Sequence, residues 1–236
     1  MNVVLQSVLW LCAYVVVVTA PLFALLFGPV PPPGGFWWDF SMALGFAALA
    51  MFAVQFALTA RFRRASAPFG VDILHYFHRY LAIGALAIAL LHYLLIRIGS
   101  PAVLGTANPL DAPPHLSAGR AALILFAVLV AVSLLRRRLR LEYEHWRALH
   151  ALGATLAAAL AYWHVIGTGY YVDTGWKQAL WSAYGMGWIA VIAHVRRVKP
   201  WRMRGKPYRV AEVRRERGDA YTLAIVDFLA SLKADR

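Results

Sequence analysis

The sequence has one cysteine among its 236 residues, and this residue, Cys12, lies in an apolar run. A single cysteine excludes a disulfide within the chain and any Cys-x-x-Cys metal or redox motif. Charged side chains are also scarce, at 15% of the residues, whereas hydrophobic ones reach 61% and the mean hydropathy is +0.58. These values are too apolar for an ordinary soluble domain and favour a membrane protein.

Nucleotide-binding motifs are missing as well. The sequence contains no Walker loop and no Gly-x-Gly-x-x-Gly fingerprint, so it indicates no dinucleotide site of its own. Acidic residues number 11 against 24 Lys and Arg, which gives a net charge of +13. Nucleic acid is a common partner for such a charge, but here the basic residues form short runs between apolar segments. That distribution is typical of a membrane protein with basic cytoplasmic loops.

Six apolar segments are long enough to cross a bilayer as helices. In chain order they are Val3–Phe27, Phe40–Ala60, Ile73–Ile98, Ala118–Leu135, Trp146–Ile166 and Lys177–Val195. The first segment has no basic residues before it and is longer than the apolar core of a signal peptide, so we interpret it as a retained membrane helix.

The connections between these segments alternate in basic content. Connections 28–39, 99–117 and 167–176 contain no Lys or Arg, whereas arginines cluster at 61–64 and 136–140 and the chain after Arg196 is strongly basic. Basic loops stay in the cytoplasm. The sequence therefore predicts six spans with both termini in the cytoplasm, in a membrane that we expect to be a bacterial inner membrane.

Two pairs of histidines share one spacing. His78 and His92 lie 14 residues apart in the third segment, and His150 and His164 lie 14 apart in the fifth. Fourteen residues of α-helix rise about 21 Å and leave the two side chains about 40° apart on one face. The predicted topology puts His78 level with His150 on the cytoplasmic side, and His92 level with His164 on the outer side. Two facing helices then form two stacked imidazole gaps, the geometry that two haems need to form an electron path.

Other readings of these histidines exist. They could be polar residues packed between helices, and imidazole also binds Zn and Cu. The sequence offers no carboxylate or thiolate near the pairs, however, and two trans imidazoles are the ligands of a six-coordinate haem. Alanines and glycines are frequent in both segments, which leaves room for a flat porphyrin, although small residues also simply allow close helix packing.

Two further histidines, His75 and His145, lie about 100° off the faces that carry the pairs, so they are less suited as ligands. Arg79 and Arg147 lie beside them at the expected cytoplasmic interface. There they could bind haem propionates or extend to the lipid headgroups. We include both arginines among the predicted cofactor-binding residues.

The outer connections are weakly anionic, since they contain Asp111 and Asp173 but no Lys or Arg. Such a surface suits a neutral acceptor such as dioxygen, or a ferric chelate held by hydrogen bonds and aromatic rings. Arg97 and Arg120, close to this surface, could hold a propionate or an acceptor carboxylate. We expect His115 to be a surface histidine in an outer loop, and His194 one at the end of the sixth segment.

The tail from Lys199 to Arg236 differs in kind from the rest. Tyr208–Val213 and Tyr221–Val226 are rich in β-branched and aromatic residues, with Gly218-Asp219 between them, which indicates a hairpin. A hairpin of this size cannot bury a core of its own. The sequence thus predicts an all-α membrane domain over 1–198, a six-helix bundle with two stacked b-type haems, and a hairpin-like cytoplasmic tail over 199–236.

The segment HRYLAIGALAIALLH (His78–His92), together with YEHWRALH and the later His164, resembles the ferric reductase-like transmembrane domain. That family includes ferric-chelate reductases and NADPH oxidases, and the resemblance covers residues 40 to 200 or so. It implies six helices and two haem b groups, held by four histidines that correspond to His78, His150, His92 and His164. The tail is similar to the opening strands of the FAD-binding barrel that follows this domain in such enzymes.

The resemblance implies an oxidoreductase in which electrons pass from NAD(P)H through FAD and two haems to an extracytoplasmic acceptor, a ferric chelate or dioxygen. FAD and NAD(P)H would be bound by a separate flavoprotein or a domain outside this sequence. Two alternatives remain open. The chain could be the haem b subunit of a periplasmic reductase, of the methionine sulfoxide reductase type, or a non-enzymatic transporter or sensor whose histidines relay protons.

Overall fold

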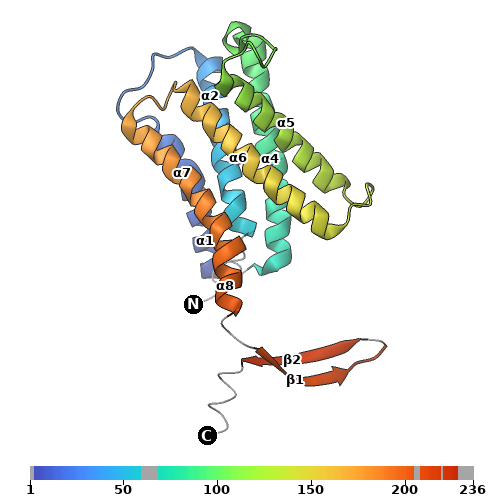
Figure 1. The fold of residues 1–236 in the computed structure, drawn as a ribbon. Helices are drawn as coiled ribbons and strands as arrows, with labels where there is room; N and C mark the ends of the chain where they lie inside the picture. Colours follow the sequence, from blue (N-terminus) through green and yellow to red (C-terminus); the bar gives the residue numbers. More distant parts are fainter. Residues whose placement is uncertain (1–2, 60–68, 205–207, 219, 228–236) are drawn as a thin grey trace. The chain divides into compact units, whose positions relative to one another are not determined.

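A computed structural model describes residues 3–59, 69–204, 208–218 and 220–227 of the chain (Figure 1). The arginine cluster at 61–64 lies outside the described residues. The structure divides into two compact units that meet in sequence between Ile189 and Ala190, and each is described by itself. The helical unit contains both histidine pairs, and the second unit contains the β-hairpin.

Every predicted apolar segment forms a helix whose ends lie within a few residues of the predicted ones. The helices are α1 (Val3–Ala24), α2 (Phe36–Thr59), α4 (Gly70–Gly99), α5 (Pro114–Leu135), α6 (Tyr143–Thr168) and α7 (Gly175–Ala193), with a short 3₁₀ turn, η1 (Pro101–Leu104), after α4. Helices α5 and α6 lie side by side, and so do α2 and α4 (Figure 1).

Five of these helices, α1, α2, α4, α5 and α6, are long and apolar enough to cross a membrane. The chain is an integral membrane protein. Among the described helices, α7 falls short of the same criteria, because its 19 residues include Lys177, Gln178 and several glycines and polar aromatics. A sixth span therefore stays a prediction.

The lysine in α7 is fully buried, and its partners explain why the fold tolerates it. Lys177 Nζ donates to the backbone oxygens of Leu25 and Pro29, at 2.9 and 2.7 Å. Leu25 directly follows the last residue of α1, where carbonyl groups lack partners in the helix and favour a cation. Lys177 thus fastens the end of α1 and the following loop to the start of α7.

Two helix ends position the residues that matter below. Helix α5 begins at Pro114, and proline suits the first turn because it has no N–H to leave unpaired and its φ is already helical. The expectation that His115 lies in an outer loop is therefore wrong, since His115 belongs to the first turn of α5. Helix α6 ends before Gly169, whose φ of 68° is the left-handed conformation that glycine adopts most easily.

The centre of the helical unit lies midway between the histidines along each helix. Ala85 is seven residues from both His78 and His92, and Ala157 is seven from both His150 and His164; these two alanines are 0% and 1% exposed. Phe52 of α2 and Phe126 of α5 pack against each other nearby, with ring centroids 4.5 Å apart. Small residues at this level let the helices approach closely, and the two phenyl rings fill the remaining space.

The second unit begins within α7 and continues through a π-helical turn, η2 (His194–Val198), and α8 (Lys199–Arg204). It then forms the antiparallel strands β1 (Tyr208–Arg215) and β2 (Tyr221–Asp227). The predicted hairpin is confirmed, and both strands begin at the predicted residue. Gly218 has the positive φ, 77°, that a tight turn requires, whereas Asp219 lies outside the described residues.

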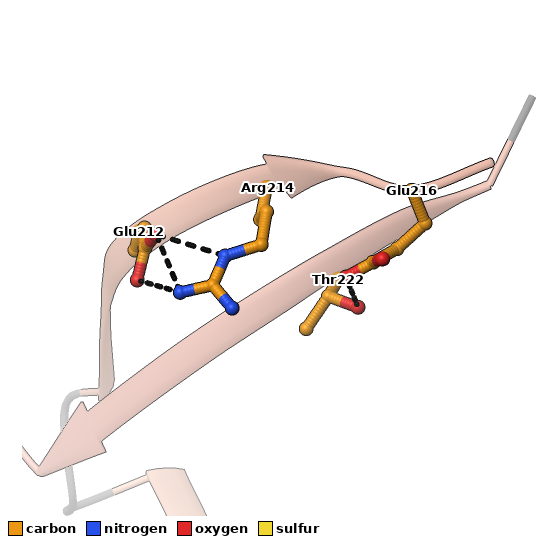
Figure 2. Close-up of polar contacts among 4 residues, drawn as sticks. All are labelled: Glu212, Arg214, Glu216 and Thr222. Atoms are coloured by element: carbon orange, nitrogen blue, oxygen red, sulfur yellow. Dashed lines mark hydrogen bonds and ion pairs between the residues drawn. The ribbon is translucent and has the colours of Figure 1, made fainter.

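The hairpin has one polar and one apolar face. Figure 2 shows the polar contacts, in which Arg214 pairs with Glu212 and Thr222 donates to Glu216. A bulge between Val210 and Glu212 adds one residue to β1. Because of this extra residue, the pairs Val210/Ile225 and Val213/Leu223 lie on the same face. All four of these apolar side chains are at least half exposed within the unit.

Candidate functional site

A cavity of about 390 Å³ lies between α2, α4, α5 and α6. This volume is within the range of sites that bind small molecules and cofactors. The walls are mainly aliphatic and aromatic, and the cavity reaches inward to Phe52 and Phe126. Two of its few polar side chains are His92 of α4 and His164 of α6, so the structure brings this predicted pair together in one cavity.

The ring of His92 is fixed by Ser41 of α2. His92 Nδ1 donates to the backbone oxygen of Ser41 at 2.7 Å, and Ser41 Oγ donates to the backbone oxygen of His92 at 3.0 Å. Ser41 is only 1% exposed, so water does not compete for these bonds. A carbonyl can only accept, so Nδ1 must carry the proton, and Nε2 of the neutral ring keeps its lone pair.

His164 is held in the same way by a different helix pair. Its Nδ1 donates to the backbone oxygen of His115 in α5 at 3.0 Å. The tautomer is therefore the same as for His92, and Nε2 is again the basic nitrogen. The cavity thus receives two imidazoles whose free nitrogens are suited to bind a metal, with the other nitrogens bonded as is usual for metal-binding histidines.

Glycine makes both bonds possible. Gly45 lies four residues after Ser41, and a Cβ built on it would lie 3.0 Å from His92 Cε1. Gly119 lies four residues after His115, and its Cβ would lie 2.7 Å from His164 Nδ1. In a helix the residue at i+4 covers the carbonyl of residue i. A glycine there lets the imidazole lie against the helix and reach that oxygen.

The second predicted pair, His78 and His150, is also brought together. Their ring centroids are 6.3 Å apart and the rings are inclined by 76°. Imidazole nitrogens bind metals at about 2 Å, so two rings on opposite sides of one ion have centroids about 6 Å apart. The observed separation matches that requirement. In the described part of the chain, no cluster of three or more His, Cys, Asp and Glu could hold a metal, so each pair offers two imidazole ligands.

The anchoring of this second pair differs from that of the first. His150 Nδ1 lies 3.2 Å from Ser133 Oγ, a side-chain rather than a backbone partner. His78 Nδ1 is buried and has no hydrogen-bond partner among the described residues. One turn before His150, Trp146 packs its ring against the imidazole with centroids 5.3 Å apart. Arg136 covers Trp146 in turn, with its guanidinium 5.4 Å from the ring centroid.

Arg79 and Arg147 lie near the His78/His150 pair in sequence, and the structure leaves both exposed. Arg147 is exposed and pairs with Glu144, and Arg79 is exposed with its guanidinium 6.0 Å from the ring of Tyr80. Their predicted role as propionate partners stays a prediction. Arg120 does line the cavity, where its guanidinium donates to the backbone oxygens of Thr106 and Leu104.

The two histidines that the sequence disfavoured as ligands, His75 and His145, are both exposed. His145 Nδ1 lies 2.9 Å from a carboxylate oxygen of Glu142, and its side chain is 81% exposed. Neither histidine lines the cavity.

Aromatic side chains line the cavity at the end near His92. Tyr171 donates its hydroxyl to Asp39 Oδ1 at 3.0 Å, and Tyr170 donates to the backbone oxygen of Pro32 at 3.3 Å. Burial, together with the bond and charge of Asp39, raises the pKa of Tyr171 to about 12. Tyr171 is therefore a neutral phenol at physiological pH.

Sequence reasoning named the four histidines that the structure brings together in two pairs, but it missed the residues that orient them. Ser41, Gly45 and Gly119 attract no attention by type, and His115 acts through its backbone oxygen. One signal was present, because a glycine follows both anchoring residues at the same four-residue spacing. That repetition can be interpreted only when the structure shows that each glycine faces a histidine.

A model of the family described as ferric reductase like transmembrane component matches residues 44–161. This is half of the chain. The chain belongs to the ferric reductase-like transmembrane family. Membership suggests oxidoreductase activity and electron transfer across a membrane in general. The match includes His78, His92 and His150 and ends three residues before His164, so the placement of His164 rests on its geometry. No curated protein matches the chain.

Proposed function

We propose that the chain carries single electrons across a membrane through two b-type haems. His92 and His164 would hold one haem, and His78 and His150 the other. The observation that carries the proposal is the pair of Nδ1 bonds to Ser41 O and His115 O. Both bonds leave an Nε2 lone pair free on the same cavity, which is the donor set that a bis-histidine haem needs.

A haem with two histidine ligands supplies a one-electron carrier without an open coordination position. The residues of this chain then have three tasks. The imidazoles bind and hold their orientation through Nδ1, the apolar walls of the cavity exclude water, and Phe52 and Phe126 keep the two sites apart at a fixed distance. Arg120 offers a cationic donor near the rim for the propionates.

The charge pattern supports one orientation of the chain in the membrane. We infer six spans, with α7 as the sixth, and a cytoplasmic side marked by the arginines at 136–140 and the basic chain after Arg196. Both termini are then cytoplasmic, and a bacterial inner membrane fits this arrangement. The His78/His150 pair lies nearer the cytoplasm, and the His92/His164 pair nearer the outside.

The electron donor is a cytoplasmic flavoprotein or a further FAD and NAD(P)H domain. The exposed apolar face of the hairpin, formed by Val210, Val213, Leu223 and Ile225, supports this, because such a face is stable only when covered. The acceptor is extracytoplasmic, a ferric chelate or dioxygen. The connections on that side contain no Lys or Arg, so they attract no strongly anionic chelate over long range.

A visible spectrum tests the proposal. The purified full chain, loaded with haem and reduced with dithionite, is expected to show the sharp α band of haem b and two haems per chain. His92→Ala or His164→Ala should remove one haem, and His78→Ala or His150→Ala the other.

The matched controls are His75→Ala and His145→Ala, which change an exposed histidine three and five residues before a proposed ligand and should leave both haems in place. A folded, haem-loaded wild type with fewer than two haems would refute the two-site proposal. Loss of a haem in the His75 variant would move the ligand assignment to that residue.

A further inference from the structure

One imidazole nitrogen stands apart from its three equivalents. Nδ1 of His92, His164 and His150 has a partner, respectively Ser41 O, His115 O and Ser133 Oγ. Nδ1 of His78 is buried and has none among the described residues. A buried polar atom without a partner costs free energy, so the fold should provide an acceptor for it.

A second buried group on the facing helix also lacks partners. Gln55 of α2 is 5% exposed, and both its Oε1 and its Nε2 are without a hydrogen bond in the described structure. An amide oxygen accepts up to two hydrogen bonds, which is what a protonated Nδ1 requires. One helix pair therefore contains an unpaired donor and an unpaired acceptor.

The register of α2 against α4 places these two residues at the same level. Ser41 contacts His92, and further along α2 the methyl of Met51 lies near Gly84, so the two helices run antiparallel. Gln55 is 14 residues after Ser41, and His78 is 14 residues before His92. Fourteen residues are two heptads, after which packed helices present the same faces again.

Buried residues follow this repeat. On α2 every seventh residue is buried, through Ser41, Ala48 and Gln55, and on α4 the residue midway between the histidines is the fully buried Ala85. The register that pairs Ser41 with His92 thus places Gln55 at the level of His78 two heptads later.

We propose that Gln55 is a positioning residue for His78, with its Oε1 accepting the hydrogen bond from His78 Nδ1. This bond gives His78 the same tautomer as the other pair, with Nε2 free to bind. The proposal rests on the haem-binding function proposed for His78. It concerns Gln55, which would contact His78 and not the haem.

The acceptor for His78 Nδ1 must be a side chain, because the corresponding backbone oxygen on α2 is already covered. The position that corresponds to Gly45 two heptads later is Thr59, whose Oγ1 donates to the backbone oxygen of Gln55 at 3.2 Å. Thr59 has a Cβ where Gly45 has none, and its hydroxyl already donates to the backbone oxygen of Gln55. An imidazole therefore cannot approach this oxygen as His92 approaches Ser41 O. The Gln55 amide is the acceptor that remains.

The test is a redox titration of the full haem-loaded chain, with the haem of the His78/His150 pair identified by its absence in His150→Ala. Gln55→Leu removes the acceptor, so the imidazole becomes a weaker donor to iron and that haem should shift to a higher midpoint potential. Its haem affinity should fall roughly 10–100-fold, as for other partners of metal ligands. The haem of the His92/His164 pair should not change.

Two variants make the result specific. Gln55→Glu keeps the size and supplies a stronger acceptor, so it should lower the potential of the same haem, and it stays informative if the Leu variant does not fold. Thr59→Val removes the neighbouring hydroxyl and should leave both potentials unchanged.

Shifts of opposite sign in the Leu and Glu variants cannot come from a purely structural role. Unchanged potentials in both Gln55 variants, or a shift in Thr59→Val equal to that of Gln55→Leu, would overturn the assignment. A wild type without two haems would instead refute the proposed function, before any variant is compared.

Discussion

The two histidine pairs lie on the same helices and are anchored by different kinds of groups. His92 and His164 bond to backbone oxygens, each reached over a glycine. His150 faces the hydroxyl of Ser133, and His78 Nδ1 has no partner among the described residues. A backbone anchor depends on helix packing and survives most changes of side chain. A side-chain anchor can be changed by one substitution, so the properties of the second site are easier to tune.

The same contrast appears at two sets of positions, namely the residues four positions after Ser41 and His115 and the residues two heptads further along the chain. In the His92/His164 site these are Gly45 and Gly119. Two heptads along the chain, the corresponding positions are Thr59 and Ser133. Hydroxyl residues thus stand in place of both glycines, and at His150 the contact is with the side chain of Ser133 rather than with the helix backbone.

The largest effect is expected from filling the glycine space. In Gly119→Val the Cβ alone would lie 2.7 Å from His164 Nδ1, so the ring must leave its position and its bond to His115 O. We expect the affinity for the haem of the His92/His164 pair to fall about 100-fold, so that this haem is lost, whereas the haem of the other pair is retained. Haem content and the spectrum of the reduced protein measure this.

Gly187→Val is the matched control for this variant, because it lies in a helix and a Cβ there meets nothing within 4 Å. The contrast between the two sites would be wrong if Gly119→Val kept both haems, or if it lost the haem of His78 and His150 instead.

The second-largest effect, on haem affinity, should distinguish the side-chain anchor of His150 from the backbone anchor of His92. Ser133→Ala removes the group next to His150 Nδ1, so the haem of that pair should bind about tenfold more weakly. Ser41→Ala leaves the backbone oxygen that His92 Nδ1 binds at 2.7 Å. It removes the bond from Ser41 Oγ to the backbone oxygen of His92, worth about 1 kcal/mol of folding free energy, and the longer contact of 3.1 Å between Ser41 Oγ and His92 Nδ1.

Haem titrations of the two apo proteins and their thermal unfolding provide the comparison. Equal losses of haem affinity in the two serine variants would show that backbone and side-chain anchors do not differ in the way described.

The smallest effect concerns pH and the rim of the His92/His164 cavity. Burial and Asp39 raise the pKa of Tyr171 to about 12 from 10.0, so the folded state holds this proton more tightly than the unfolded state. The stability that this provides is fully present below pH 10 and is lost as the pH rises through 12. Tyr171→Phe should cost about 1 kcal/mol or less at pH 8, through the lost bond to Asp39.

The difference in unfolding midpoint between wild type and Tyr171→Phe should therefore shrink between pH 10 and 12. Thermal unfolding of the two proteins across that range measures it. A difference that stays constant up to pH 12 would mean that the phenol of Tyr171 is not held by Asp39.

Much of the fold was predictable because it depends on local patterns. Long apolar runs give helices in a membrane, and alternating β-branched residues around a glycine turn give the hairpin at 208–227. The start of α5 was placed too late, since the proline at Pro114 was not used as a helix start signal. His115 was therefore assigned to a loop, although its backbone belongs to a helix and holds His164.

The candidate site was predictable only in part. The spacing of 14 residues is a property of one helix, and it was enough to name the four histidines. Arg79 and Arg147 were chosen from neighbouring positions in sequence, and the structure leaves both exposed near the His78/His150 pair. Arg120, which the sequence placed close to the outer surface, lines the cavity of the His92/His164 pair. Whether Arg79 or Arg147 turns toward the His78/His150 pair depends on the rotation of each helix about its axis, and sequence spacing does not fix that rotation.

The sequence by itself determined that this is a membrane protein, where its helices begin and end to within a few residues, and which imidazoles share a helix face. Only the tertiary structure decided which nitrogen of each imidazole stays free. That choice depends on backbone oxygens of the neighbouring helices, such as those of Ser41 and His115. Every residue has such an oxygen, so no residue type marks it, and it becomes accessible only where two helices pack in one register over a glycine.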